Sequence, residues 1–269
     1  MTISGKTRIF AIVGDPIVQA RTPALLNPML AAAGIDAVLL PFHVPAASFA
    51  MMMPALKAMA NLDGLVVTYP FKERALAHVD VASDRARMLG VVNAMRRRAD
   101  GGWEGDMFDG IGLLAPVEAR RPVAGAKVLL IGAGGAGRAI AVAFAAAGAA
   151  SIAVSDLDAA REASLAALIE ANFPTCGARR GCDGVGSYDI VVNATTLGMK
   201  PGDPPPIALT ELQPSTLVAD VVPSDRPTAF LTAASEKGAA TVAGHEMTKG
   251  QAKVLMQFLT ANLPAASER

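Results

Sequence analysis

Apolar runs along the chain alternate with amphipathic stretches, and this alternation predicts strands that alternate with helices. Short apolar runs that end at turn residues predict buried strands, and apolar side chains three or four residues apart predict helices. Thr22 has the position of a helix N-cap, because Pro23 follows it at the first helical position. Strands joined by helices in this way pair in parallel. In the first part of the chain, residues 8–13, 37–42 and 65–68 predict strands, and residues 22–33 and 45–60 predict helices.

The segment that follows has a different pattern. Residues 84–89 predict a short helix, and residues 91–98 and 103–107 predict two strands. The turn at residues 99–102 joins these strands, so we expect a hairpin. Residues 109–119 then predict a helix that leads into the second half of the chain.

The second half again alternates strands with helices, which is the pattern that a doubly wound parallel sheet requires. We therefore expect an α/β fold in which an N-terminal α/β domain is combined with a Rossmann-type parallel sheet. The predicted strands are residues 128–131, 151–154, 189–193, 217–222 and 240–242, and the predicted helices are residues 139–147, 159–171, 228–236 and 247–263.

A glycine-rich turn, here named the glycine loop (residues 132–137), follows the first strand of the second half. Gly132, Gly134 and Gly137 have G-x-G-x-x-G spacing. The first glycine permits a tight turn, the second lets the backbone approach a pyrophosphate, and the third lets helix and strand pack closely. The helix N-terminus adds free N–H groups and a partial positive charge. The loop therefore predicts a dinucleotide site at Gly132, Gly134, Gly135, Ala136 and Gly137.

Asp156 ends the next strand, about 20 residues beyond Gly137, which is the spacing of the acidic residue in dinucleotide-binding units. A carboxylate there accepts hydrogen bonds from a ribose 2′-OH and repels the 2′-phosphate of NADP. The sequence therefore predicts NAD as the cofactor. The alternative is that Asp156 is a solvated residue at a strand end and that Asp158 or Arg161 decides the preference.

The composition argues against several classes of function. The chain is 52% hydrophobic, and its 24 basic side chains balance its 24 acidic ones, so we expect a sizeable core and no nucleic-acid partner. No stretch has the pattern of a signal peptide or the roughly 20 apolar residues of a membrane helix, so we expect a cytoplasmic protein without a membrane partner. The two cysteines and three histidines lack metal-ligand spacing, so no metal site is expected.

Lys72 and Asp109 are the candidate pair for acid–base chemistry. Oxidation of an alcohol by a nicotinamide needs a base near the hydroxyl and a second polar group that orients it. Lys72 follows a strand and a proline turn, and Asp109 begins a helix. A lysine opposite an aspartate can share a proton with it, and partial burial lowers the pKa of a lysine toward the working range. The alternative is that both are solvated surface residues.

Seven segments together resemble the shikimate dehydrogenase family, in the family's order and over nearly the whole chain. The resemblance implies a substrate-binding and catalytic domain formed by residues 1–108 with 244–269, and a Rossmann domain formed by residues 109–243. The segments are Gly-Asp-Pro-Ile (14–17), Val-Thr-Tyr-Pro-Phe-Lys (67–72), Gly-Val-Val-Asn-Ala (90–94), Asp-Gly-Ile-Gly (109–112), the glycine loop, Asn-Ala-Thr-Thr-Leu-Gly-Met (193–199) and Gly-His-Glu-Met-Thr-Lys-Gly-Gln-Ala (244–252).

The resemblance also implies a reaction and roles for single residues. The reaction is reversible hydride transfer between the nicotinamide of NAD and a ring hydroxyl of shikimate, quinate or a related cyclic hydroxy acid. Dimers are common in families of this kind, so a homodimer is a further expectation. Lys72 would handle the hydroxyl proton, and Asp109 would orient the same hydroxyl. The implied substrate-binding residues are Thr22, Thr68, Asn93 and Gln251, and the further cofactor-binding residues are Asn193, Ala194, Thr195, Val221, Gly244 and Met247.

This chain departs from the family's pattern around the substrate. The Ser-x-Ser that holds the substrate carboxylate in the family is Ala20-Arg21-Thr22 here, so one hydroxyl is missing. Arg21 could hold a carboxylate instead, or it could be solvated. The other departures are Gln19 for a histidine, Val66 for an asparagine, Met107-Phe108 for Asn-Thr and Pro223 for a tyrosine. We expect the chemistry to be retained and the substrate to be altered.

Two classes of function remain open at the level of the sequence. The first is a dehydrogenase of the shikimate or quinate type, in which Asp156 in place of that loop's usual arginine favours NAD and a catabolic or paralogous role. The second is an NAD-binding sensor or regulatory protein on the same fold. The intact Lys72 and Asp109 favour the enzyme, because a sensor has no chemical need for either.

Overall fold

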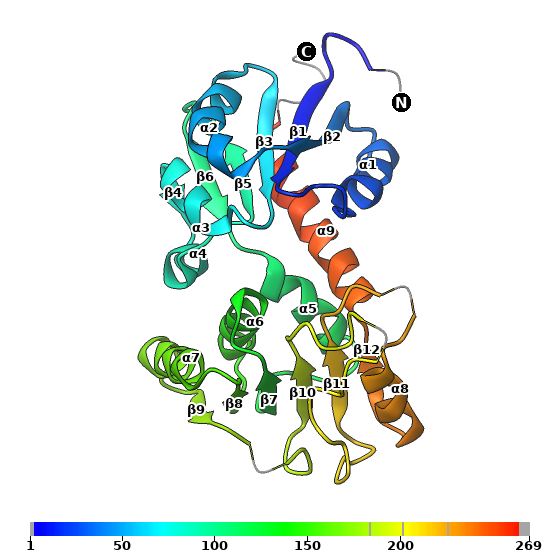
Figure 1. The fold of residues 1–269 in the computed structure, drawn as a ribbon. Coiled ribbons are helices and arrows are strands. Elements are labelled where there is room, and N and C mark those ends of the chain that lie inside the picture. Colours follow the sequence, from blue (N-terminus) through cyan, green and yellow to red (C-terminus); the bar gives the residue numbers. More distant parts are fainter. Residues whose placement is uncertain (1–2, 183, 201, 225, 264–269) are drawn as a thin grey trace. The chain divides into compact units, whose positions relative to one another are not determined.

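The computed structural model describes residues 3–182, 184–200, 202–224 and 226–263, and it divides the chain into two compact units (Figure 1). Unit 1 is formed by Met1–Phe108 with Ala252–Arg269, and unit 2 by Asp109–Gln251. Each unit has its own six-stranded sheet. The chain is therefore an α/β protein with two separately organised sheets, as the sequence pattern predicts.

Unit 1 contains a mixed sheet with the strand order β2-β1-β3-β5-β6-β4. The central strand β1 pairs in parallel with β2 and β3, whereas β5 pairs antiparallel with β3 and β6. The expected hairpin is therefore confirmed, and it converts a parallel sheet into a mixed one. The strands are β1 (Arg8–Gly14), β2 (Ala37–His43), β3 (Leu62–Val67), β4 (Val81–Ala82), β5 (Ala94–Arg97) and β6 (Trp103–Asp106).

The helices of unit 1 differ from the sequence pattern at their ends. The expected N-cap at Thr22 is wrong by one residue: Arg21 occupies the cap position, and Pro23 lies in the first turn, where its missing N–H is not needed. The second helix ends two residues early because Met59 is extended, and Arg97 donates hydrogen bonds to the carbonyl groups of Lys57 and Met59. The helices are α1 (Thr22–Ala32), α2 (Phe49–Ala58), α3 (Lys72–Ala75) and α4 (Asp84–Leu89), with 3₁₀ turns at Ala46–Ser48 and Leu76–His78.

Unit 2 contains an all-parallel sheet with the strand order β12-β11-β10-β7-β8-β9. Read from the other edge, this is the 3-2-1-4-5-6 order of a Rossmann domain, so the direction of strand addition reverses at β7. The sequence pattern missed β9, because it is an exposed edge strand without apolar periodicity. The strands are β7 (Lys127–Ile131), β8 (Ser151–Ser155), β9 (Gly177–Arg180), β10 (Ile190–Asn193), β11 (Leu217–Asp220) and β12 (Ala240–Val242).

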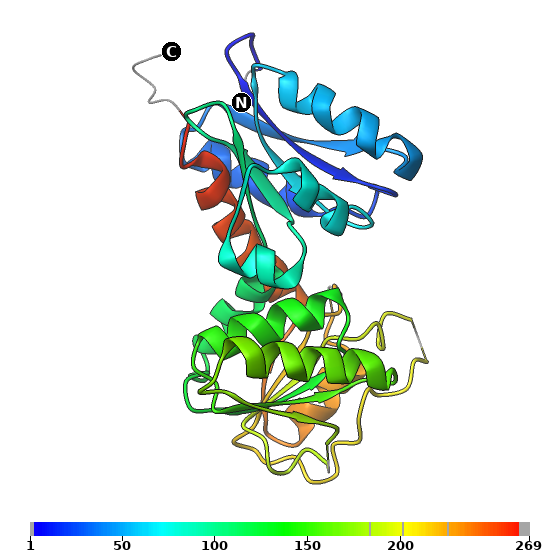
Figure 2. The same ribbon diagram turned by 90° about the vertical axis from the view of Figure 1, so that its left-hand side faces the viewer.

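Helices cover both faces of the unit 2 sheet, and α6 and α7 lie together on one of them (Figure 2). Successive residues of β7 point to opposite faces: Val128 and Leu130 belong to the core under α6, and Leu129 and Ile131 belong to the core under α8. Because both faces of the sheet are covered, the sequence of a buried parallel strand is a continuous apolar run. The helices are α5 (Asp109–Glu118), α6 (Gly135–Ala146), α7 (Ala159–Asn172), α8 (Ala229–Glu236) and α9 (Gly244–Thr260), which crosses the boundary between the units.

Among the described residues there is neither a candidate membrane-spanning helix nor a candidate metal-binding cluster. Every helix in the described ranges is too short or too polar to cross a membrane. Within the same ranges, histidine, cysteine and acidic side chains form no group of three or more that could hold a metal ion.

We predict that Gly110→Ala destabilises unit 2. Gly110 lies in α5, and a Cβ there would overlap the carbonyl oxygen of Ala139 and lie 2.9 Å from the Cβ of Ala143 in α6. Overpacking costs about 1–3 kcal/mol, so the midpoint of urea unfolding should fall. Gly5→Ala is the control, because a Cβ there has no neighbour within 4 Å. Equal midpoints for the two variants would contradict the close packing of α5 on α6.

Candidate functional site

The glycine loop joins β7 to α6 at the C-terminal edge of the unit 2 sheet. Gly132 has a φ of +101°, which a side chain would strain, and a Cβ at Gly137 would overlap the carbonyl oxygen of Gly132. At Gly134 and Gly135, in contrast, an added Cβ would have no neighbour within 4 Å. Gly134 is the N-cap of α6 and provides no side-chain cap. The N-terminus of α6 therefore has open space beside Gly134 and Gly135 and no side-chain cap, and both features suit a bound anion.

Asp156 connects the glycine loop to the end of β8. Its Oδ2 accepts the Ala133 N–H at 2.6 Å, and its Oδ1 accepts the Asp158 N–H at 2.8 Å. Burial by itself would raise the pKa of Asp156, but these two hydrogen bonds and the nearby charge of Arg161 lower it overall. The carboxylate is therefore ionised at neutral pH, and Leu157 beside it is fully exposed.

A second loop, residues 194–198, follows β10 and packs against the glycine loop. A Cβ at Gly132 would lie 2.9 Å from the carbonyl carbon of Ala194 and from the Cγ2 of Thr195. The Thr195 N–H and hydroxyl donate to the Oδ1 of Asn193, at 3.1 and 2.7 Å. The predicted cofactor residues Asn193, Ala194 and Thr195 therefore lie beside the glycine loop.

The remaining predicted cofactor positions lie at the next strand ends of the same edge. The Val221 N–H donates to the carbonyl oxygen of Asn193 at 3.0 Å. A Cβ at Gly244, the first residue of α9, would lie 2.7 Å from the carbonyl oxygen of Val221. Glycine is therefore required where α9 begins, and Met247 follows one turn later.

These loops occupy the carboxyl ends of parallel strands on both sides of the switch point at β7. Ligands of open parallel sheets bind at this position. The uncapped helix N-terminus suits a pyrophosphate, and the ionised Asp156 suits a ribose hydroxyl. The residues present therefore fit a dinucleotide.

Asp109 and Gln251 form a direct contact within unit 2. The Gln251 Nε2 donates to the Oδ1 of Asp109 at 2.6 Å, and Asp109 is 7% exposed. The contact is possible because a Cβ at Gly112 would lie only 2.9 Å from the Cβ of Gln251 and the carbonyl oxygen of Met247. The structure thus brings together a predicted catalytic residue and a predicted substrate-binding residue, beside the backbone of Met247.

The other predicted substrate-site residues lie in unit 1, two beside strand ends and two at the first positions of helices. Thr68 directly follows β3, and its N–H donates to the carbonyl oxygen of Val13 at 3.0 Å. Lys72 is the first residue of α3, and Thr22 is the first residue of α1. Asn93 is 2% exposed, and its Oδ1 accepts the Phe108 N–H at 2.9 Å. Lys72 and Asp109 belong to different units, so each is described only within its own unit.

Three of the positions that depart from the family's pattern, Ala20, Val66 and Phe108, belong to an apolar part of unit 1. Val66 and Phe108 are buried in the same hydrophobic cluster of unit 1, and Ala20 packs against that cluster. Phe108 lies 4.8 Å from the Arg85 guanidinium and 5.2 Å from the ring of Phe258. None of these three departures therefore places a hydrogen-bonding side chain in this part of unit 1.

Two polar groups at strand ends were missed by sequence reasoning. Asp15 follows β1 and contacts His43 at the end of β2, with a distance of 2.8 Å between the Oδ1 and the Nε2. This hydrogen bond and that from the Ala46 N–H lower the pKa of Asp15. Asp220 ends β11 with its side chain fully buried. In both cases a polar residue directly after an apolar strand was the available signal.

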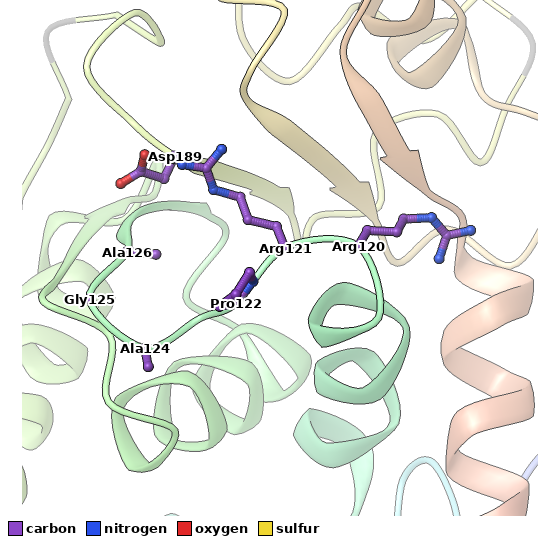
Figure 3. Close-up of a pocket in the computed structure, with 7 residues that line it drawn as sticks. All are labelled: Arg120, Arg121, Pro122, Ala124, Gly125, Ala126 and Asp189. Atoms are coloured by element: carbon purple, nitrogen blue, oxygen red, sulfur yellow. Dashed lines mark hydrogen bonds and ion pairs between the residues drawn. The ribbon is translucent and has the colours of Figure 1, made fainter.

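A hollow of about 450 Å³ in unit 2 lies away from these loops (Figure 3). It is lined by Arg120, Arg121, Ala124 and Asp189, among others, and Arg121 forms an ion pair with Asp189. Asp189 directly precedes β10, so the hollow belongs to the amino ends of the strands, opposite to the edge where ligands of parallel sheets bind. The hollow is therefore not a candidate for the dinucleotide site.

Comparisons with known proteins find similar proteins over nearly the whole chain. The family model of the shikimate dehydrogenase substrate binding domain matches residues 12–95. The shikimate dehydrogenase (NADP(+)) of Caulobacter vibrioides is 36% identical over 270 residues, which cover 98% of this chain and 93% of that protein. Shikimate 5-dehydrogenase from Listeria monocytogenes, solved with shikimate and NAD, has a TM-score of 0.91 at 28% identity and covers 100% of this chain and 96% of its own. Ligand-free 5-ketofructose reductase of Gluconobacter sp. strain CHM43 has a TM-score of 0.90 at 31% identity, with 98% of this chain and 96% of its own covered.

We predict that Gly134→Ala weakens dinucleotide binding without destabilising the fold. Gly134 has a φ of −72°, and an added Cβ has no protein neighbour within 4 Å, so the stability should change by less than about 0.5 kcal/mol. The methyl group would enter the space that a pyrophosphate needs, so affinity for NADH should fall at least about tenfold. A fluorescence titration with NADH measures this. Gly177→Ala, at an exposed position of the same unit, is the control, and equal affinities of both variants would refute the site.

Proposed function

Because the chain belongs to the shikimate dehydrogenase family, we propose that it is a nicotinamide-dependent oxidoreductase that acts on a CH–OH group of a small cyclic hydroxy acid such as shikimate or quinate. The observation that carries the proposal is the arrangement in unit 2. A glycine cradle at the switch point and a buried Asp109 held by Gln251 occur in one compact unit. A fold that only packed its own core would require neither the open face at Gly134 nor the buried carboxylate.

In this proposal Asp109 orients the substrate hydroxyl, and Lys72 exchanges a proton with it. The nicotinamide, when bound, supplies the hydride acceptor at its C4. Gln251 donates its amide to Asp109 and so fixes the direction in which the carboxylate accepts the substrate hydroxyl. Lys72, at the start of α3, takes the hydroxyl proton in the oxidation and returns it in the reduction.

We propose NAD as the preferred dinucleotide. The end of β8 presents Asp156, the fully exposed Leu157, and Asp158, which already pairs with Arg161 at 3.4 Å. A 2′-phosphate would meet two carboxylates there and a cation that is engaged with one of them. The relatives differ in their dinucleotide: the Caulobacter protein is named for NADP(+), and the Listeria structure contains NAD.

A second candidate is a neutral polyhydroxylated ketone as substrate. The apolar side chains of Ala20, Val66 and Phe108 support it. Removing a carboxylate from water and placing it against apolar groups costs free energy, whereas a neutral substrate avoids that cost. The likeness to 5-ketofructose reductase supports the same view, since the name of that protein describes a ketose as its substrate. The two candidates share the chemistry of Lys72 and Asp109. They differ in whether the part of the substrate that binds to unit 1 is a carboxylate or a neutral group.

We predict that Lys72→Ala abolishes turnover. Without the amino group no side chain takes the hydroxyl proton, so kcat should fall by at least about a hundredfold, while the affinity for NADH remains within about twofold. Wild-type protein is assayed by NADH absorbance with shikimate, quinate and 5-ketofructose, and the variant with whichever of these turns over.

Lys6→Ala, at an exposed lysine, is the control for loss of a positive charge. An unchanged kcat in Lys72→Ala would contradict the role of Lys72. NADH binding without turnover of any of the three compounds would contradict these substrates and favour a sensor on the same fold.

We predict that Asp156→Asn combined with Leu157→Arg shifts the preference from NAD toward NADP. The change removes one negative charge and adds an arginine that can pair with the 2′-phosphate. The ratio of kcat/KM for NADP to that for NAD should rise at least about tenfold. Leu157→Ala controls for loss of the exposed side chain. A ratio that stays constant would show that the end of β8 does not contact the ribose.

A further inference from the structure

Asp220 is a buried carboxylate that the reaction does not use. It is 0% exposed, and its Oδ2 accepts the Thr228 hydroxyl at 2.6 Å. Its Oδ1 accepts the Asn193 amide and the Val222 N–H at 3.0 Å each. Burial raises the pKa of Asp220, and these three hydrogen bonds from neutral donors lower it by less. Such a carboxylate is unfavourable for folding alone, so its position at the ligand edge of the sheet requires an explanation.

Asn193 connects Asp220 to the 194–198 loop through hydrogen bonds. The two residues are register partners at the ends of β10 and β11. The Asn193 Nδ2 donates to Asp220 and also to the carbonyl oxygen of Leu197 at 3.1 Å, while its Oδ1 accepts both donors of Thr195. Because the amide has a donor end and an acceptor end, Asp220 fixes the orientation in which the donor end faces Leu197 and the acceptor end faces Thr195.

Thr228 supports the same loop from its other end. Thr228 is the N-cap of α8: its hydroxyl donates to Asp220 and accepts the Leu231 N–H at 3.3 Å. A Cβ at Gly198 would lie 3.5 Å from the Cγ2 of Thr228. The hydrogen bonds of Asn193 therefore hold the loop where it begins, and Thr228 lies close to Gly198, where the loop ends.

The loop in turn lies directly against the glycine loop. The close approach of Gly132 to Ala194 and Thr195 leaves no room for a side chain between them, and a Cβ at Gly137 would contact the Cβ of Ala194 at 3.5 Å. A shift of the 194–198 loop would therefore change the shape of the space beside the uncapped end of α6.

We propose that Asp220 and Thr228 are positioning residues for the dinucleotide, because they fix the 194–198 loop against the glycine loop through Asn193. This inference rests on the proposed function, in which the glycine loop binds the cofactor. Neither residue touches the reacting atoms in this scheme. Their loss should therefore raise the Kd and KM for the dinucleotide much more than it lowers kcat.

The test compares two buried threonines. Thr228 forms its hydrogen bond with Asp220 at the C-terminal end of β11, and Thr216 directly precedes the N-terminal end. Thr228→Val removes the hydroxyl that pairs with Asp220 and keeps the shape of the side chain. Thr216→Val is the matched control, because the Thr216 hydroxyl donates to the Tyr188 carbonyl oxygen at 3.0 Å directly before β11, away from the cofactor edge. Thr228→Ser restores the hydroxyl.

Three quantities are measured on the full chain: the Kd for NADH by fluorescence, the hydrogen–deuterium exchange of residues 194–198, and the thermal midpoint. A hydrogen bond to a charged group contributes strongly, so Thr228→Val should raise the Kd about tenfold and speed the exchange of the loop. Thr216→Val should lower the thermal midpoint and leave the Kd within about twofold, and Thr228→Ser should behave as the wild type. Should Thr228→Val fail to fold, Asp220→Asn replaces it, because an amide nitrogen in place of Oδ2 cannot accept the Thr228 hydrogen.

The outcomes separate this inference from the function on which it rests. If the wild-type chain binds no NADH, the proposed function is wrong and the positioning role is overturned with it. If the wild type binds NADH and Thr228→Val changes the Kd no more than Thr216→Val does, only the positioning role is overturned, and the network serves stability alone. Faster exchange of the loop together with a selective rise in Kd supports the role.

Discussion

The rest of unit 2 depends on the close approach of α6 to the turn that precedes it. A side chain at Gly137 would overlap the carbonyl oxygen of Gly132, so the helix lies directly on the end of β7. The same helix leaves no room for a side chain at Gly110 in α5. Because packing fixes α6 from both sides, its uncapped N-terminus has a defined position at the edge where β7 changes the direction of strand addition.

Polar side chains in unit 2 gather at this same edge. Asn193 and Asp220 end neighbouring strands and are completely buried, although burial disfavours an amide and a carboxylate. The Asn193 amide donates a hydrogen bond to the Asp220 carboxylate, and Asn193 also forms hydrogen bonds with the 194–198 loop. Asp156 also holds loops in place, since its oxygens accept backbone N–H groups of the glycine loop and of its own turn. The cofactor edge is therefore formed by ordered loops whose shape depends on buried hydrogen bonds.

Unit 1 follows a different principle. Its mixed sheet ends in polar residues at β1, β2 and β3, but the cluster that includes Val66 and Phe108 is apolar. Lys72, the proposed base, thus lies in a unit in which Ala20, Val66 and Phe108 offer no side-chain hydrogen bonds at three positions where the family's pattern is polar. Under the proposed function, this difference would alter substrate recognition, which depends on many groups, more than hydride transfer, which depends on few.

The sequence by itself determined the alternating elements, the Rossmann type of the second sheet and the glycine loop, because these follow from local periodicity and from backbone conformations that only glycine adopts without strain. It also indicated Asp156 through its spacing from the glycine loop, and Lys72 and Asp109 through their places in the predicted elements and the family resemblance. Only the tertiary structure decided the strand β9, which has no apolar periodicity, and the N-cap of α1 at Arg21. It alone revealed the Asp15–His43 contact and the Asp220 network, since these join residues 28 and 27 positions apart and no local pattern encodes a partner at that separation.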